Sequence, residues 1–207
     1  MAKKVFLKIY QELRERYGKP KDQWKLWCKR KKTEREREWV AIEAILTQRT
    51  NWRNVEMAMN NLKKNKLDSL SKIYQLGSKR ISGLIKPAGF YQQKAECLFL
   101  LAKFIIEEHG SLKAIKRERK EILREKLLRL KGIGPETADS ILLYALDKPV
   151  FVIDEYTKRF VKERKIADNF SYSYLQNLFE KNLKKDFKLY QDFHALFVID
   201  GKRKRQK

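Results

Sequence analysis

Hydrophobic residues recur at every third or fourth position along most of the chain, which is the spacing of one buried face of an α-helix. In the first half, the clearest groups are Trp39, Ile42, Ile45 and Leu46, then Val55, Ala58, Met59 and Leu62, then Ala95, Leu98, Phe99, Ala102, Ile105 and Ile106. The same spacing returns in the second half, in residues 141–146, 175–179 and 187–198. The pattern predicts helices throughout both halves.

One short segment departs from this pattern. Residues 149–153, PVFVI, have the density of β-branched side chains that is typical of a strand. A five-residue segment between two predicted helices is more typical of an extended connector than of a paired strand. The sequence therefore predicts an all-α protein.

The chain of 207 residues is strongly basic, with 49 Lys and Arg against 26 Asp and Glu, a formal net charge of +23. A charge of this size is expected to attract a polyanion, and nucleic acid is the first candidate. An acidic membrane surface would match the same charge, but Lys8 interrupts the short apolar stretch near the N-terminus and no run is long enough to span a bilayer. We expect a soluble, intracellular protein with no membrane partner.

The sequence holds only two cysteines, Cys28 and Cys97, which lie far apart. Their number excludes a disulfide framework and any zinc or iron–sulfur site with four cysteine ligands. We expect both to be free thiols.

The most informative segment is a glycine-containing turn between two predicted helices. The chain turns through Lys131, Gly132, Ile133 and Gly134, and Pro135 then occupies the first position of the next helix, where a missing N–H costs nothing. This predicts a helix-hairpin-helix. An ordinary turn with a glycine C-cap needs one glycine, and the second favours a backbone that approaches a DNA phosphate at the start of the following helix.

This hairpin and several other segments resemble the helix-hairpin-helix DNA glycosylases of the endonuclease III superfamily, and the 3-methyladenine branch most of all. In that family, the hairpin is followed by a connector that ends in a catalytic aspartate, and the matching residue is Asp154 in VIDEYTKRF. The segments ILTQRTNW, GFYQQKA and FHALFVIDGK resemble further family motifs. The resemblance covers the chain from about Glu38 onward.

Two departures from the wider family change what the resemblance implies. Bifunctional members carry a lysine in the second hairpin helix that forms a Schiff base with the sugar, and this chain has Glu136 at that place. The family's four-cysteine cluster is lost, because no cysteine follows Cys97. The resemblance thus implies a monofunctional enzyme with no iron–sulfur cluster and no metal.

The two acidic candidates each have a structural alternative. Asp154 precedes a predicted helix and makes a good N-cap; the resemblance adds a catalytic role, in which the carboxylate stabilises an oxocarbenium ion or orients water. Glu136 suits the first turn of a helix by its charge, and the catalytic alternative is that it shapes or polarises the base pocket.

The resemblance also assigns residues to the DNA surface and the base pocket. Gln48 is the candidate that fills the gap left by an extruded base, and the hairpin residues 131–134 are the candidates that bind the phosphate. The candidates for the base pocket are Trp52, Trp24, Trp27 and Lys202. The alternative for the tryptophans is that they pack in the core. The alternative for Lys202 is that a lysine occurs at this position by chance, because the tail is rich in basic residues. We expect His194 to be a core histidine and His109 to end a helix, with no catalytic role for either.

We therefore expect two helical lobes with a DNA-binding cleft, one of residues 38–149 and one of residues 1–37 with 150–207. The expected enzyme is a cytoplasmic, nucleoid-associated monomer that removes an alkylated purine such as 3-methyladenine from double-stranded DNA. One alternative is a glycosylase of the same fold for mismatched uracil or thymine, or for an oxidised purine. Another is a DNA-binding protein that uses the hairpin without catalysis.

Overall fold

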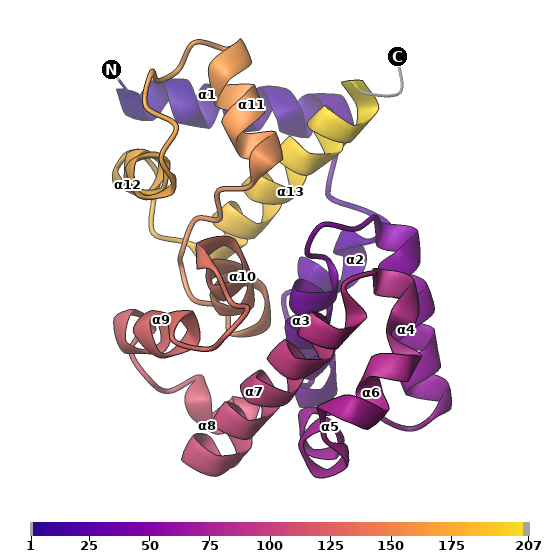
Figure 1. Ribbon diagram of the computed structural model, residues 1–207. Coiled ribbons are helices and arrows are strands. Elements are labelled where there is room, and N and C mark those ends of the chain that lie inside the picture. The colour runs from indigo at the N-terminus through magenta and orange to yellow at the C-terminus, as the bar shows by residue number, and fades with distance from the viewer. Residues whose placement is uncertain (1, 205–207) are drawn as a thin grey trace. The chain divides into compact units, whose positions relative to one another are not determined.

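The computed structural model describes residues 2–204, and all regular secondary structure in that range is helical (Figure 1). The first half contains α1 (Ala2–Tyr17), α2 (Trp24–Trp27), α3 (Glu34–Leu46), α4 (Trp52–Lys64), α5 (Leu70–Leu76), α6 (Ser78–Leu84), the 3-10 turn η1 (Lys86–Ala88) and α7 (Tyr91–His109). The second half contains α8 (Leu112–Ile115), α9 (Lys120–Leu128), α10 (Pro135–Ser140), the π-helical turn η2 (Ile141–Ala145), α11 (Glu155–Glu163), α12 (Tyr172–Asn182) and α13 (Phe187–Lys204). The predicted all-α class is confirmed.

The described residues divide into two compact units. The terminal unit combines the chain up to Arg30 with the chain from Asp147 onward, and the middle unit is Lys31–Leu146. The lobe boundaries expected from the sequence, after residues 37 and 149, lie near these divisions. That the two lobes are separate domains stays a prediction. Among the described residues, no helix is both long and apolar enough to cross a membrane.

The core of the terminal unit is a cluster of aromatic rings around the connector. Phe151 stacks on Phe179 with ring centroids 4.3 Å apart, and both side chains are fully buried. The connector's backbone is bonded to side chains of α12: Phe151 N donates to Glu180 at 2.9 Å, and Gln176 donates to Phe151 O at 2.8 Å. Residues 149–153 have no regular secondary structure, which confirms the predicted extended connector. The side chains of α12 satisfy backbone groups that a partner strand would otherwise bind.

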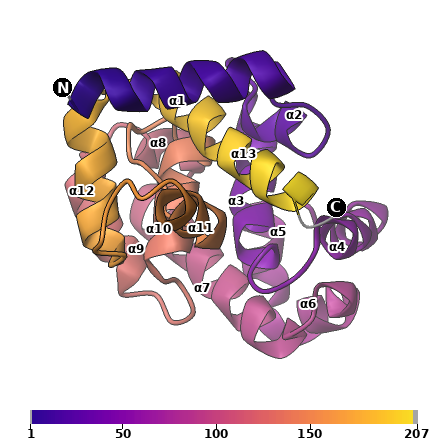
Figure 2. The same ribbon diagram turned by 90° about the horizontal axis from the view of Figure 1, so that it is seen from above.

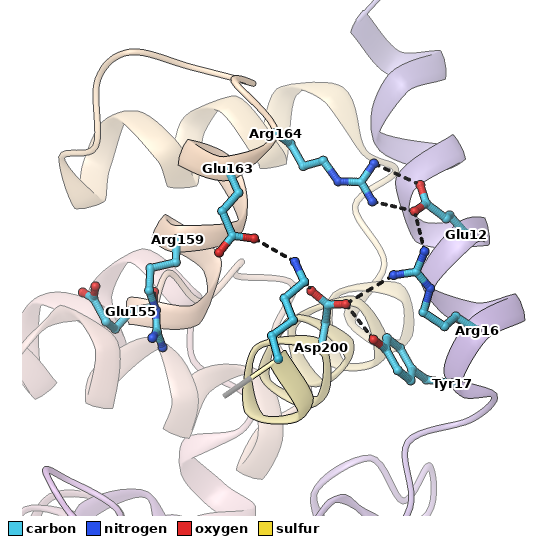
Figure 3. A network of polar contacts seen from close by, with 9 residues as sticks. Glu12, Arg16, Tyr17, Glu155, Arg159, Glu163, Arg164 and Asp200 are labelled. Carbon is cyan, nitrogen blue, oxygen red and sulfur yellow. Dashed lines mark hydrogen bonds and ion pairs between the residues drawn. The ribbon is translucent and has the colours of Figure 1, made fainter. Parts of the chain in front are cut away.

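Helix α13 packs against α1 and α11 (Figure 2). A network of charged side chains joins its C-terminal end to these two helices (Figure 3). Asp200 is buried and accepts from the Tyr17 hydroxyl at 2.7 Å, while Lys204 Nζ lies 2.9 Å from its other oxygen. Glu12 of α1 pairs with Arg164, which follows α11, at 2.5 Å. The buried carboxylate is therefore satisfied, as a charge inside a protein must be.

The middle unit is built around α3. A capping box between Thr33 and Glu36 starts this helix, and every residue from Val40 to Leu46 is buried. A helix that is buried all round packs against several neighbours, and α3 contacts α4, α7, α8, α10 and η2. The helices predicted from the three hydrophobic groups of the first half are confirmed.

Candidate active site

The predicted helix-hairpin-helix is formed by α9, the turn after it and α10, all in the middle unit. Gly132 has a φ of +89°, a conformation that favours glycine, and a Cβ atom built there would lie in tight contact with Cys97 Sγ, at 3.2 Å. The side chain of Ile133 is buried and anchors the turn, whereas Lys131, Gly132 and Gly134 are exposed. The turn therefore presents its backbone outward.

The second glycine has a different role from the first. Gly134 is the N-cap of α10 with a φ of −92°, which any residue adopts, and no atom lies within 4 Å of a Cβ built there. Its conformational freedom is not needed by the fold. Glycine at this position instead keeps the surface at the start of α10 free of a side chain.

An ion pair between a half-buried arginine and a buried aspartate fixes the two hairpin helices to each other. Arg124 of α9 binds Asp139 of α10 through two parallel hydrogen bonds, Nε–Oδ1 at 2.7 Å and Nη2–Oδ2 at 3.0 Å. Asp139 is fully buried, so the pair sets the geometry of the hairpin. This pair was not predicted, because both hairpin helices carry more than one charged residue and their spacing does not show which two meet.

Gln48, the candidate that fills the gap left by the base, contacts the hairpin directly. Its Nε2 atom donates to Gly132 O at 3.0 Å and to Thr137 Oγ1 at 2.9 Å. The structure thus brings together two motifs that are far apart in sequence, and the Gln48 amide is bound to the hairpin in this state.

Lys94, which was not among the predicted site residues, binds the end of α3 close to Gln48. Its buried ammonium donates to Leu46 O at 2.9 Å and to Ala88 O at 2.7 Å, which satisfies a carbonyl at the C-terminal end of α3. Burial lowers the pKa of Lys94 to about 8. The lysine in GFYQQKA was the available signal, but the spacing alone does not show that it is buried.

The remaining candidates of the middle unit lie at its surface. Glu136 is exposed in the first turn of α10, Trp52 is half-buried at the first position of α4, and the exposed Lys131 pairs with Glu96 at 3.1 Å. The roles that the resemblance assigns to these three residues stay predictions.

In the terminal unit, Asp154 is the N-cap of α11. Its Oδ1 atom accepts from Thr157 N at 2.7 Å and from Thr157 Oγ1 at 2.9 Å. His194 of α13 faces the other oxygen, with Nε2 3.5 Å from Oδ2. Burial alone would raise the pKa of Asp154, but the nearby imidazole and the bonds from Thr157 outweigh it and lower the pKa. The carboxylate is therefore ionised although it is buried.

The other candidates of the terminal unit gather around this pair. Trp24 and Trp27 form α2 with their rings edge to face, centroids 5.7 Å apart, and the Trp24 ring meets the His194 ring at 5.9 Å. Each tryptophan is only 6% exposed, as the core alternative predicts, so stacking on a base requires these rings to become accessible.

Lys202 is part of the same group. Its Nζ atom donates to Gln23 Oε1 at 2.8 Å, next to α2. Burial lowers the pKa of Lys202, and the charge of Asp154 acts in the opposite direction. The amine is thus partly desolvated and within electrostatic reach of the catalytic candidate.

The histidines lie where the sequence predicted, with one addition. His194 is 4% exposed, which confirms a core position, and His109 ends α7 before Gly110. That His194 faces Asp154 was not predictable from the sequence, because the two residues belong to different helices. Among the described residues, no cluster of three or more His, Cys, Asp or Glu side chains is arranged to hold a metal ion.

A helical fold with a braced glycine hairpin, followed in the chain by a buried, ionised aspartate at a helix N-terminus, defines a class of DNA base excision enzymes. The chain belongs to this class: the sequence profile of the HhH-GPD superfamily of base excision DNA repair proteins matches residues 42–185. It is a DNA glycosylase of the endonuclease III superfamily, as its motifs predicted.

Individual relatives agree with this assignment. The chain is 43% identical over 197 residues to "Putative DNA repair glycosylase MJ1434" of Methanocaldococcus jannaschii, covering 94% of this chain and 86% of that protein. The crystal structure of the Helicobacter pylori 3-methyladenine DNA glycosylase MagIII bound to 1,N6-ethenoadenine is 28% identical, with a TM-score of 0.80 and 98% of each chain covered. A trapped endonuclease III–DNA covalent intermediate shares the fold at 16% identity and a TM-score of 0.72, covering 95% of this chain and 85% of that one.

Proposed function

We propose that the protein is a monofunctional DNA glycosylase that hydrolyses the N-glycosidic bond of an alkylated purine, such as 3-methyladenine, in duplex DNA. The observation that carries this proposal is the position of the Asp154 carboxylate, which is buried and held at the N-terminus of α11 by two hydrogen bonds from Thr157. Glycosidic bond cleavage builds positive charge on the sugar, and a fixed negative charge stabilises that transition state more than the ground state.

In this mechanism, the C1′–N bond breaks and its electron pair leaves with the base. A water molecule then adds its oxygen to C1′, and the carboxylate of Asp154 orients that water or accepts its proton. An N3-alkylated adenine carries a positive charge in the nucleotide and leaves as a neutral base. Such a substrate does not need a general acid at the base.

The hairpin supports DNA as the substrate. Lys131, Gly132 and Gly134 are exposed, and Gly134 leaves the start of α10 open to a phosphate. The net charge of +23 supplies sequence-independent attraction to the backbone. The endonuclease III structure that shares this fold is a complex with DNA.

Glu136 supports hydrolysis rather than strand cleavage. A bifunctional enzyme needs an amine that forms an imine with the opened sugar, and the position in α10 where the resemblance places that amine holds an exposed carboxylate. We propose that the enzyme has no iron–sulfur cluster, since two cysteines cannot supply four ligands.

The choice of base rests on the similarity to MagIII, whose structure holds 1,N6-ethenoadenine and aligns over 98% of both chains. A thermostable thymine-DNA glycosylase is 20% identical with a TM-score of 0.68, a likeness that extends to the fold alone. An alkylated purine is therefore favoured over a mismatched pyrimidine.

A panel of matched duplexes tests the proposal. Each duplex holds 3-methyladenine, 1,N6-ethenoadenine, uracil or thymine opposite guanine, or 8-oxoguanine, and the released base is measured at single turnover. We expect release from an alkylated purine and no borohydride-trapped adduct that forms as fast as the base is released. Faster release of a pyrimidine or an oxidised purine would contradict the substrate class, and rapid trapping would contradict the monofunctional mechanism.

A further inference from the structure

The two oxygens of Asp154 have different environments. Thr157 donates two hydrogen bonds to Oδ1, from N at 2.7 Å and from Oγ1 at 2.9 Å. Oδ2 receives neither of these bonds, and His194 Nε2 lies 3.5 Å from it. The cap therefore fixes one end of the carboxylate, and the other end is faced by the imidazole.

The His194 ring is itself held in place. It lies on the buried face of α13 with 4% of its surface exposed, and the ring of Trp24 meets it edge-on at an interplanar angle of 87°. A ring packed in this way has little freedom to turn its Nε2 atom away from Asp154. Three elements thus converge on one carboxylate: α11 supplies the cap, α13 the imidazole and α2 the ring that supports it.

We propose that His194 is a positioning residue for Asp154. The Nε2 atom of His194 holds the Oδ2 atom of the Asp154 carboxylate in the direction of the reacting sugar. The proposal rests on the proposed function, because it assigns His194 a part in the same reaction. His194 acts through Asp154 and need not touch the base or the sugar. Loss of this contact leaves Asp154 Oδ2 without a group that holds its direction, and the reaction depends on the orientation of this carboxylate.

The contact also affects the ionisation of Asp154. The charged and polar groups that act on this carboxylate are Thr157 from α11 and His194 and Lys202 from α13, while α2 presents the uncharged Trp24 ring. Burial raises the pKa of Asp154, and the His194 imidazole is the largest of the influences that lower it. Removal of the imidazole therefore raises the pKa of Asp154, and activity is lost at a higher pH on the acid side.

Two substitutions at one position separate positioning from packing. His194→Leu fills the space without a donor, and His194→Gln carries an amide donor near the place of Nε2. Phe193→Leu is the matched control, because Phe193 is fully buried on the same helix and packs on Phe151, Phe179 and Phe197. Melting curves at each pH identify any variant that fails to fold.

We expect His194→Leu to slow single-turnover base release by tenfold to a hundredfold, on the order of what misplacement of a catalytic group costs. The acid limb of its pH profile should move to higher pH. His194→Gln should recover part of the rate, and Phe193→Leu should lower the melting temperature without moving the acid limb. A folded His194→Leu variant with the wild-type rate and acid limb would overturn the proposal.

A titration of the Asp154 carboxyl carbon by NMR, in the wild type and in His194→Leu, gives a readout that does not need activity. A raised pKa in the variant supports the contact, and an unchanged pKa overturns it. If the wild type releases none of the tested bases, the proposed function fails while this titration still decides the role of His194.

Discussion

The side-chain amide of Gln48 donates a hydrogen bond to the carbonyl oxygen of Gly132 at 3.0 Å, which joins the loop after α3 to the hairpin. The same Nε2 atom donates to Thr137 Oγ1 at 2.9 Å. A residue that fills the gap left by an extruded base must leave these partners when it enters the DNA. The free protein therefore holds Gln48 in a bound position beside the predicted phosphate site.

A comparison of Gln48→Ala with Thr137→Val tests whether Gln48 fills that gap. We expect Gln48→Ala to slow base release by about tenfold or more, because extrusion costs a few kcal/mol that the inserted side chain helps to offset. Its affinity for undamaged duplex should stay near the wild-type value. Thr137→Val removes one bond to Gln48 and keeps the side chain, and it should release base at nearly the wild-type rate. Equal losses of undamaged duplex affinity in both variants would show that Gln48 instead stabilises the hairpin.

The two hairpin glycines should respond differently to substitution. Gly132→Ala should lower the free energy of unfolding by about 1–2 kcal/mol, the cost of a left-handed conformation for an L-residue, and the contact with Cys97 adds to this loss. Gly134→Ser keeps a good N-cap and should leave stability within about 0.5 kcal/mol of the wild type. Its side chain enters the open space at the start of α10, so we expect weaker binding to any duplex. Urea unfolding and duplex titrations measure both quantities, and unchanged duplex affinity in Gly134→Ser would remove this surface from the binding site.

The ion pair between Arg124 and Asp139 should be a major source of hairpin stability. Arg124→Ala removes both hydrogen bonds from the guanidinium to the fully buried Asp139 carboxylate. We expect the free energy of unfolding to fall by about 3 kcal/mol. Arg124→Lys keeps the charge but not the fork of donors, so its loss should be smaller. Denaturant unfolding of the three proteins checks this order, and a wild-type midpoint for Arg124→Ala would contradict it.

Lys94 makes the stability of the protein depend on pH in a predictable direction. Its pKa is lowered from 10.5 to about 8 in the folded protein, so the unfolded chain binds more protons between these values. The free energy of unfolding should therefore rise with pH from about 8 to 10.5, as far as Lys94 determines it. We expect the stability of the wild type relative to Lys94→Met to increase over this range in urea unfolding. A constant or decreasing difference would contradict the assigned burial of the charge.

The sequence was sufficient for those features that depend on neighbouring residues. Helical spacing predicted the all-α class, and the residues from Lys131 to Pro135 predicted the hairpin, because a turn and the start of a helix are determined by local chemistry. The cap formed by Asp154 follows from the same kind of signal.

Other features depend on how the helices pack and were not predictable from one sequence. His194 and Asp154 lie on different elements, and periodicity shows that each faces a core without showing that they face each other. Gly134 resembled Gly132 in sequence, but only Gly132 has a positive φ. Trp24 and Trp27 were candidates for an open pocket, and their burial depends on the packing of α2.

The proposed mechanism depends on Asp154, and single-turnover base release by Asp154→Asn tests it most directly. Asparagine is as good an N-cap as aspartate, so the variant should keep its fold and its affinity for lesion-containing duplex. It lacks the negative charge that stabilises the transition state, and we expect release of an alkylated purine to fall by about a hundredfold or more. Release at the wild-type rate by a folded, DNA-bound Asp154→Asn protein would contradict the proposed mechanism.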